Sequence, residues 1–512
     1  MQRLDPRTRT GLLVGALAMF LALDVAFLAS LIGLPFTPLA LGQAIIDVLP
    51  GAISIPLIET LQYWAKGGLV IGVLVLFLAA GALGGALAVD EMRRGRTVAA
   101  AVAAPWATAV VLGQLFASSR IDLVTSVIDA AVGVAAHALV LAFLVPASLA
   151  RESAPAPGRR RLLLNAAGVA ALVAVGVLPI SRVFAGAGAK IGGVPQAARR
   201  LAARAAIPTA DPQIEALAGV TARITANEDH YTVDTTLVKP RVDVATWKLE
   251  IGGNVDRPYA LTYEELLDLE AVEEVRTLEC ISNPVGGELI GTAVWTGVRM
   301  KDLLERAGPR TNSYDVALRS VDGYEDSFAI AKALEPGTIV AYLMNGVTVP
   351  QDHGYPARVL VPDIYGMKNV KWLQQIRVEA FDFKGYWQKQ GWNDKAVVHT
   401  NTRIDLPSRQ IRWSGGEVPV AGIAFAGARG IRSVELSFDE GKTWRAATLE
   451  EPSGPLTWRR WVQRWTPTGP GPVTIWARAT DGKGDVQTPI QREPYPDGAT
   501  GYHVLSAQVI VV

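Results

Sequence analysis

Residues 352–362 read DHGYPARVLVP, and residues 366–372 read GMKNVKW. These two runs contain four basic or imidazole side chains, separated by glycines and by apolar, strand-like sequence: His353, Arg358, Lys368 and Lys371. A planar guanidinium next to ammonium groups suits a phosphate ligand. A solvated turn can show the same spacing, so the spacing alone leaves both interpretations open.

The thiol content of the chain is also unusual. Cys280 is the single cysteine among 512 residues, so it can form no internal disulfide. A lone thiol in an exported domain is prone to oxidation unless it is buried or bound to a metal. Cys280 is therefore a candidate ligand, with a buried structural cysteine as the alternative.

Several ordered motifs resemble the sulfite oxidase family. The runs at 352–362 and 366–372 are similar to its cofactor-phosphate segment, and LECISN at 278–283 resembles its metal-binding cysteine loop. TAVWTGV at 292–298 matches the segment after that loop, and TANEDHY at 225–231 resembles a loop against the pterin. LSFDEGKTW at 436–444 is similar to the C-terminal dimerisation domain of the family. The resemblance covers residues 220–512 and rests on motifs in the same order.

The resemblance implies a molybdenum–molybdopterin cofactor. Cys280 would bind the metal through its thiolate, a soft donor that suits it. The pterin phosphate would be held by His353, Arg358, Lys368 and Lys371, although Lys368 stands where the family often has arginine. The pterin or metal pocket would be lined by Asn227, His230, Tyr231, Ser282 and Asn283. Trp295 and Tyr386 are expected near the substrate, with a core position as the alternative for Trp295.

Departures from the family pattern concern the substrate. Two arginines that bind sulfite in the family are replaced here by Ala226 and Pro284. A tyrosine that often precedes a Lys-Gly pair is replaced by Phe383, with Tyr386 close in sequence. Losing two guanidinium groups removes most of the charge that attracts a small dianion. We therefore expect sulfite to be a poor substrate.

The second half of the chain reads as two soluble domains. Residues 216–398 mix strands with short helices, including a capping box at Thr262 and Glu265 and a helix over 301–308 ended by Gly308. This predicts an α+β molybdopterin-binding oxidoreductase domain. Residues 399–512 show short alternating strands separated by glycine turns, which predicts an all-β immunoglobulin-like sandwich.

The first half predicts an all-α transmembrane bundle over residues 1–185, followed by a linker over 186–215. Five apolar segments are long enough to span a bilayer: 11–34, 67–89, 97–117, 127–149 and 162–185. Residues 38–60 contain charges and prolines and are interpreted as an interfacial or re-entrant segment. Ten arginines flank one side of these spans, whereas the loops on the other side carry only Lys66 and Arg120. The positive-inside rule then places the N-terminus inside and everything after residue 186 outside the cytoplasm.

Other features of the first half are more ambiguous. Arg159, Arg160 and Arg161 precede three leucines, which resembles a twin-arginine export signal but also fits simple positive-inside anchoring. Ionisable residues within the spans are few, namely Asp24, Asp129 and His137. Two buried histidines would be needed for a bis-histidine haem, so a membrane haem is not expected.

Together these features predict a plasma-membrane, multi-pass oxidoreductase with an extracytoplasmic catalytic half. It would transfer an oxygen atom to or from a small-molecule substrate and exchange electrons with a separate carrier, a quinone or a cytochrome. The bilayer lipids and a second copy of the chain, through the C-terminal sandwich, are further expected partners. A net charge of +1 without a basic surface run argues against nucleic acid. The rivals are a cofactor-free receptor or assembly module, and a transporter or redox bundle regulated by the outer domain.

Overall fold

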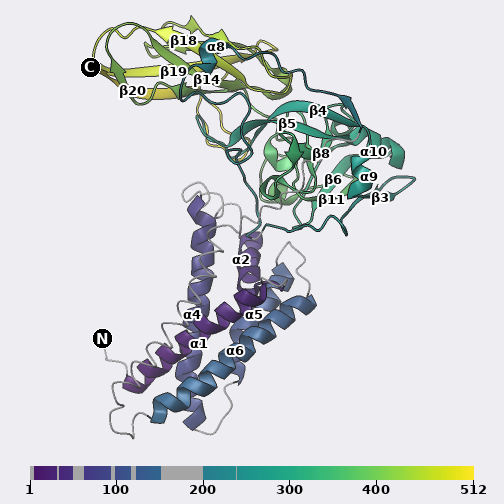
Figure 1. The fold of residues 1–512 in the computed structure, drawn as a ribbon, viewed down its shortest axis with the longest axis vertical. Helices are drawn as coiled ribbons and strands as arrows, with labels where there is room; N and C mark the ends of the chain where they lie inside the picture. Colours follow the sequence, from purple (N-terminus) through teal and green to yellow (C-terminus); the bar gives the residue numbers. More distant parts are fainter. Residues whose placement is uncertain are drawn as a thin grey trace. The chain divides into compact units, whose positions relative to one another are not determined.

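The structure is a computed structural model that describes residues 5–30, 34–49, 53, 63–93, 99–116, 123–150, 200–237 and 239–512 (Figure 1). The chain divides into two compact units. Residues 1–190 and 235–238 form the first, helical unit, and residues 191–234 and 239–512 form the second. Each unit is described by itself.

The helical unit is built from apolar helices. They are α1 (Pro6–Ser30), α2 (Thr37–Val48), α4 (Tyr63–Arg93), α5 (Ala99–Phe116) and α6 (Leu123–Ala150). Three contain stretches long and apolar enough to cross a bilayer, judged by length and composition alone: Thr8–Ser30, Ala65–Val89 and Leu123–Ala142. These stretches fall on the first, second and fourth predicted spans.

The remaining predicted spans fare differently. The third, at 97–117, coincides with α5, a shorter apolar helix that contains Pro105. The first half of the predicted interfacial segment at 38–60 is the helix α2. The fifth span at 162–185, the arginine run at 159–161 and most of residues 50–60 lie outside the described residues.

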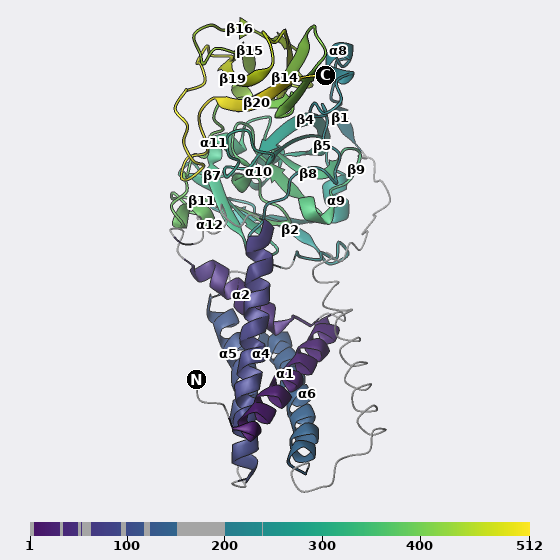
Figure 2. The ribbon, with the colours of Figure 1, turned by 90° about the vertical axis from the view of Figure 1, so that its left-hand side faces the viewer.

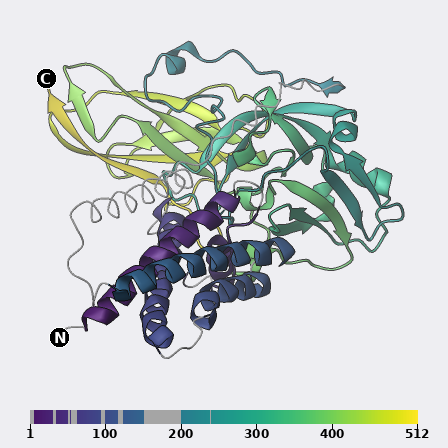
Figure 3. The same ribbon diagram turned by 60° about the horizontal axis from the view of Figure 1, so that its bottom comes forward.

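Glycines bring α1 and α4 into backbone contact. Figure 3 shows the helices of this unit from another side. On α1, a β-carbon at Gly11 would lie 2.8 Å from the Ala86 Cα, and one at Gly15 would lie 2.7 Å from the Gly85 Cα. On α4, a β-carbon at Gly81 would meet the Met19 side chain. Each helix thus presents a small-xxx-small pair, which permits the close approach that stabilises helix association in bilayers.

A buried carboxylate joins α6 to α2. Asp129 is fully buried, and its Oδ2 accepts a hydrogen bond of 2.9 Å from the backbone N–H of Thr37 in the first turn of α2. The positive end of a helix favours such a charge. Asp129 therefore has a structural role in the unit.

The second unit begins with two sheets (Figure 2). One has the order β1-β4-β5-β8-β10, with β9 paired to β8: β1 (Leu201–Ala203), β4 (Ala271–Glu279), β5 (Ile290–Arg299), β8 (Ile339–Met344), β9 (Val347–Thr348) and β10 (Arg358–Leu360). The other has the order β3-β2-β11-β6-β7: β3 (Tyr259–Thr262), β2 (Lys248–Gly253), β11 (Leu373–Glu379), β6 (Asp315–Ser320) and β7 (Glu325–Ala329).

Short helices connect these strands. They are α9 (Tyr263–Leu267), α10 (Met300–Ala307), α11 (Ile330–Ala333) and α12 (Tyr386–Lys389), with the 3-10 turns η1 (Gln351–His353) and η2 (Gly366–Lys368). The predicted capping box is present, because Thr262 and Glu265 exchange hydrogen bonds at the start of α9. Gly308 ends α10 with φ +70°, as its glycine predicts. The α+β prediction is confirmed.

The β-rich domain consists of two further sheets. The first has the order β12-β14-β18-β17: β12 (Asn401–Leu406), β14 (Val418–Phe425), β18 (Arg459–Trp465) and β17 (Thr448–Leu449). The second has the order β13-β20-β19-β15-β16: β13 (Gln410–Trp413), β20 (His503–Val511), β19 (Gly471–Asp481), β15 (Ile431–Ser437) and β16 (Arg445–Ala446). Buried residues of both sheets, among them Val420 and Trp461 of the first and Val434 and Ile475 of the second, form one core.

Part of the predicted linker is packed against this unit. Residues 201–203 form β1, which pairs in parallel with β4. Asp211 caps the short helix α8 (Pro212–Glu215), and Ile214 packs against Ala421 and Val462 of the β-rich domain. Residues 200–215 therefore belong to a folded part of the structure, whereas residues 186–199 lie outside the described ranges.

The glycine contact between α1 and α4 can be tested by adding volume. We expect Gly15→Leu to destabilise the helical unit by about 1–3 kcal/mol, because the side chain would overlap the α4 backbone. Thermal unfolding of the purified protein in detergent measures the change. Gly72→Leu is the matched control, since no atom of the described residues lies within 4 Å of a β-carbon built at Gly72. Equal melting temperatures for the two variants would contradict the packing described.

Candidate active site

Cys280 lies directly after β4, at the start of a turn. The residue is 7% exposed, and its Sγ lies 3.0 Å from the Ser282 Oγ. Burial raises the pKa of the Cys280 thiol, against the lowering effect of the Ser282 hydrogen bonds. Asn283 shapes the same turn, because its Oδ1 accepts from the Leu289 N–H at 2.9 Å and its Nδ2 donates to Glu279 at 2.9 Å.

Polar contacts fasten the predicted pterin-facing loop at residues 225–231 to the rest of the domain that carries β4, β5 and β8. The Nε2 of His353 lies 2.7 Å from the Asn227 carbonyl oxygen. Asn345, which adopts φ +50°, donates from Nδ2 to the Asn227 Oδ1 at 2.8 Å and to the Thr225 carbonyl at 2.9 Å. The structure thus brings together Asn227 and His353, which are 126 positions apart in the sequence.

A cluster of rings surrounds His230. Its ring stacks on Tyr231 at 5.3 Å and meets the rings of His353 at 5.4 Å and Trp295 at 6.2 Å edge to face. Burial lowers the pKa of His230 to about 3, with His353 and Arg358 acting in the same direction. Burial also lowers the pKa of His353 to about 4. Both imidazoles are therefore neutral near pH 7 and serve as hydrogen-bonding or packing groups.

Arg358 is a buried cation of the site. It is 5% exposed and donates to the carbonyls of His353 at 2.9 Å and Asn369 at 3.2 Å, while its Nε makes no hydrogen bond within the described residues. Burial lowers the pKa of Arg358 to about 10, so it stays charged at neutral pH. No ion pair of Arg358 is found in the described part of the chain. A buried charge without a counter-charge is costly, and an anionic ligand would supply one.

Trp295 lies behind this cluster. Its side chain is fully buried in the core formed by β4, β5, β8 and β10, and the Arg358 guanidinium lies 5.2 Å from its ring centre. Of the two interpretations drawn from sequence, this burial favours the core position.

Tyr231 lies near the end of β4, the strand that leads into Cys280. Its hydroxyl lies where a β-carbon on Gly366 would come within 2.5 Å, and the Glu279 carbonyl oxygen lies 3.2 Å from the same point. Burial raises the pKa of Tyr231, an effect that Cys280 strengthens and Arg358 opposes. The Tyr231 hydroxyl therefore lies near the backbone of Glu279, the residue that precedes Cys280.

The two predicted phosphate-binding lysines differ from Arg358. Lys368 is buried, and its Nζ donates to the Asp326 Oδ1 at 2.9 Å, the Ser327 carbonyl at 2.6 Å and the Asp394 Oδ1 at 3.3 Å. These acceptors match the three protons of an ammonium group. Lys371 lies 3.2 Å from the Asp234 Oδ2 and 4.4 Å from the centre of the Trp372 ring. The chain thus neutralises both lysines, which the spacing of basic residues could not show.

Tyr386 lies on α12 in an aromatic group. Its ring is 6.2 Å from Tyr324 and 4.9 Å from Trp387. The hydroxyl of Tyr324 donates to the Asp326 Oδ2 at 2.9 Å, which ties the aromatic group to the carboxylate that holds Lys368.

Sequence reasoning missed two residues beside the site. Glu279 precedes Cys280, and its carboxylate accepts from Asn283 and, at 2.9 Å, from the Asn401 Nδ2. Burial raises the pKa of Glu279 to about 7, although both amides lower it. Asp326 compensates Lys368. A charged residue at the end of a buried strand was the only available signal for Glu279, and none distinguished Asp326.

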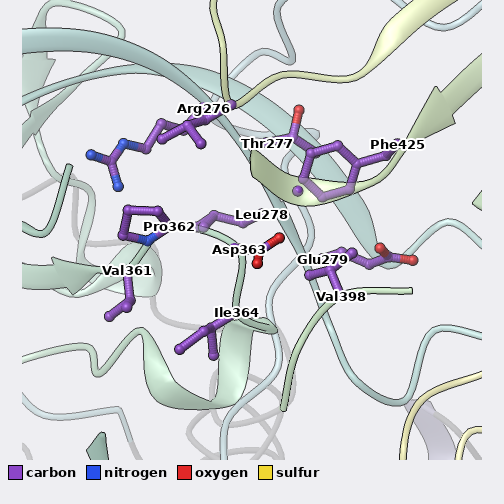
Figure 4. A pocket seen from close by; sticks show the side chains of 12 residues that line it. Arg276, Thr277, Leu278, Glu279, Val361, Pro362, Asp363, Ile364, Val398 and Phe425 are labelled. Atoms are coloured by element: carbon purple, nitrogen blue, oxygen red, sulfur yellow. The ribbon is translucent and has the colours of Figure 1, made fainter. Parts of the chain in front are cut away.

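A small cavity lies beside the same strand (Figure 4). It is lined by residues of β4, of the 361–364 segment and of the β-rich domain, including Arg276, Glu279, Asp363 and Phe425. None of the predicted site residues lines it. It lies where the domain that contains β4 meets the β-rich domain, and we assign it no ligand.

The residues present fit a molybdopterin cofactor. Among the described residues, the unpaired Nε and the uncompensated charge of Arg358 suit a phosphate. The sole thiol of the chain follows Glu279, whose carbonyl oxygen and the Tyr231 hydroxyl lie near the same point beside Gly366. Lys368 departs from this fit, because its donors are already used within the chain.

Comparisons with known proteins agree with this fit. The family description "Oxidoreductase molybdopterin binding domain" matches residues 236–387, and "Mo-co oxidoreductase dimerisation domain" matches residues 394–489. The mitochondrial sulfite oxidase of Macaca fascicularis is 29% identical over 296 residues, which cover 48% of this chain and 54% of that protein. An NAD(P)H nitrate reductase of Hordeum vulgare is 28% identical over 281 residues, 43% of this chain and 31% of that protein.

A solved structure shares the fold. The crystal structure of the sulfane dehydrogenase SoxCD from Paracoccus pantotrophus matches with a TM-score of 0.50 and 21% identity, over 58% of this chain and 86% of that one. The chain spans about half the length of the sulfite oxidases that it matches. From the two matching domains and these relatives, residues 236–489 are identified as the molybdopterin-binding and dimerisation domains of an oxidoreductase similar to the sulfite oxidase family, whose cofactor is molybdenum–molybdopterin.

Proposed function

We propose that this protein is a membrane-anchored molybdenum enzyme that transfers an oxygen atom to or from a small substrate outside the cytoplasm. The observation that supports this most strongly is the buried Arg358, whose charge no described carboxylate neutralises and whose Nε makes no hydrogen bond within the described residues. The relatives include proteins named for sulfite oxidation and for nitrate reduction. The direction of the reaction therefore stays open.

The residues of the site divide the work as follows. Cys280 would bind molybdenum through its thiolate, and Arg358 would supply the charge that holds the pterin phosphate, while Lys371 stays paired with Asp234. The neutral rings of His230 and His353, with Tyr231 and Asn227, would line the pterin, while Ser282 and Asn283 would shape the cysteine turn. Lys368 would act indirectly by holding Asp326 and Asp394. When bound, the cofactor supplies two-electron chemistry at the metal, and the protein supplies ligation and orientation.

Metal analysis tests this assignment. We expect about one molybdenum and one pterin per chain in protein from a host that makes the cofactor, because one thiolate would anchor each cofactor. Cys280→Ser should lose activity and most of the molybdenum while keeping its circular dichroism spectrum. An active Cys280→Ser variant would rule out the ligand role.

The rival of a cofactor-free receptor or assembly module makes the opposite forecast. Such a module would contain neither molybdenum nor pterin in the same host. A regulated membrane transporter would also be free of molybdenum. Wild-type protein devoid of the metal would therefore end the enzyme proposal.

The loops around the proposed substrate pocket favour a substrate other than sulfite. Ala226 and Pro284, which replace two sulfite-binding arginines of the family, are both exposed. Neither residue carries a positive charge. We therefore propose that these two positions attract a small dianion such as sulfite only weakly.

Restoring the two charges tests this interpretation. The Ala226→Arg, Pro284→Arg double variant should raise kcat/KM for sulfite by roughly tenfold or more, because charge-assisted hydrogen bonds to an anion are strong. The matched control is the Ala216→Arg, Ser408→Arg double variant, which adds the same charge at two exposed positions, the residue that ends α8 and a residue of the β-rich domain. Efficient sulfite turnover by the unmodified protein would contradict the proposal.

We further propose that residues 1–185 form a membrane bundle and that the catalytic half lies outside. The three long apolar helices and the arginine bias of the loops support this. We also propose that the two packed sheets of residues 399–512 are an immunoglobulin-like sandwich that forms a homodimer, as the matched dimerisation domain suggests. The electron partner would be a separate quinone or cytochrome.

Cysteine accessibility tests the orientation, since the chain has one cysteine to remove. In a Cys280→Ser background, Ser408→Cys should react with a membrane-impermeant maleimide in intact cells. Arg9→Cys, in the first turn of α1, should react only after lysis, because the positive-inside rule places it in the cytoplasm. The reverse pattern would overturn the proposed side of the membrane.

A further inference from the structure

The turn that carries Cys280 contacts the β-rich domain. We call residues 280–289 the cysteine loop. Arg403 of β12 donates from Nη1 to the Gly287 carbonyl at 2.9 Å. His503 of β20 lies against Gly286, where a β-carbon would come within 2.5 Å of the imidazole Nε2. Two strands that are remote in sequence thus touch the same loop.

A second connection runs through Glu279. One carboxylate oxygen accepts from Asn283 inside the cysteine loop, and the other accepts from Asn401 of β12, each at 2.9 Å. Glu279 is buried, and a buried carboxylate is stable only when it is hydrogen-bonded. Because each carboxylate oxygen accepts one of these hydrogen bonds, Glu279 joins the cysteine loop to β12 at the residue just before Cys280.

The β12 contacts are themselves held rigidly. Arg403 also donates to the Asp405 Oδ1 at 2.7 Å and to the Thr221 Oγ1 at 2.5 Å. His503 accepts a hydrogen bond of 2.8 Å from the backbone N–H of Ile404. The guanidinium of Arg403 therefore cannot follow a displaced loop without breaking further bonds.

We infer that Asn401 and Arg403 are positioning residues for Cys280, through which the β-rich domain holds the cysteine loop in the arrangement that the metal ligand needs. This rests on the proposed metal-binding role of Cys280. The contacts bracket the thiol on both sides, at Glu279 before it and at Gly286 and Gly287 after it. Supporting contacts of this kind orient metal ligands and tune the bound metal.

The single thiol allows the loop to be observed alone. In full-length protein made without cofactor, the labelling rate of Cys280 by a thiol reagent reports how often the loop opens. Asn401→Ala and Arg403→Ala should each raise this rate by roughly tenfold or more, because each removes a contact that closes the loop. In cofactor-loaded protein, the same variants should shift the g values of the Mo(V) electron paramagnetic resonance signal.

The controls separate positioning from general stability. Arg412→Ala removes an exposed arginine from β13, the next strand in the sequence, which lies in the other sheet of the β-rich domain. Cys280 in this variant should be labelled at the wild-type rate. Melting temperatures identify variants that unfold, and Asn401→Ser provides a milder change at the same position. Labelling rates within about twofold of the wild type, together with unchanged g values, would overturn the inference.

Failure of the underlying metal assignment has a different signature. If Cys280 binds molybdenum, loaded wild-type protein labels far more slowly than cofactor-free protein. Equal labelling of the two forms would refute the ligand role, while faster labelling of the cofactor-free Asn401→Ala variant would still support the contact between β12 and the loop.

Discussion

The site depends on a buried positive charge, that of Arg358, which no carboxylate in the described part of the chain neutralises. The two terminal nitrogens of Arg358 donate hydrogen bonds to the carbonyls of His353 and Asn369, and both acceptors are uncharged. An isolated charge inside a protein is stable only if a counter-charge joins it. Among the described residues no carboxylate takes that place, so the fold is arranged for an anion from outside the chain. A pterin phosphate satisfies this requirement.

The neighbouring lysines explain why the requirement is so localised. Lys368 is paired with Asp326 and Asp394, and Lys371 with Asp234. A lysine ammonium is a compact charge that three acceptors can satisfy, whereas a guanidinium has five donors in a fixed fork. Lysine at position 368 therefore suits a closed internal network. The cluster that looks uniform in sequence separates into one available cation and two compensated ones.

This separation also marks what the sequence could and could not predict. The capping box at Thr262 and the glycine that ends α10 depend on residues close in sequence, so local patterns predict them. The order of the family motifs can likewise be read directly from the sequence. The contacts of Asn227 with His353 and of Glu279 with Asn401 join positions 126 and 122 residues apart. Such pairs depend on how the sheets meet, which no local pattern records. For Trp295 the pattern left two options, and burial among four strands favours the core.

The location of Cys280 gives these long-range contacts their importance. A residue just beyond a strand keeps the direction of that strand but loses the ladder of hydrogen bonds that fixed its neighbours. Glu279, the last residue of β4, still pairs with Ile290 of β5. Beyond it, the hydrogen bond from the Cys280 N–H to the Leu289 carbonyl is the last one of this ladder. The side chains of Asn283, Asn401 and Arg403 replace the missing ladder. A metal ligand at the end of a strand can therefore be as well ordered as one within it, provided that a second domain supplies the bonds that the sheet no longer makes.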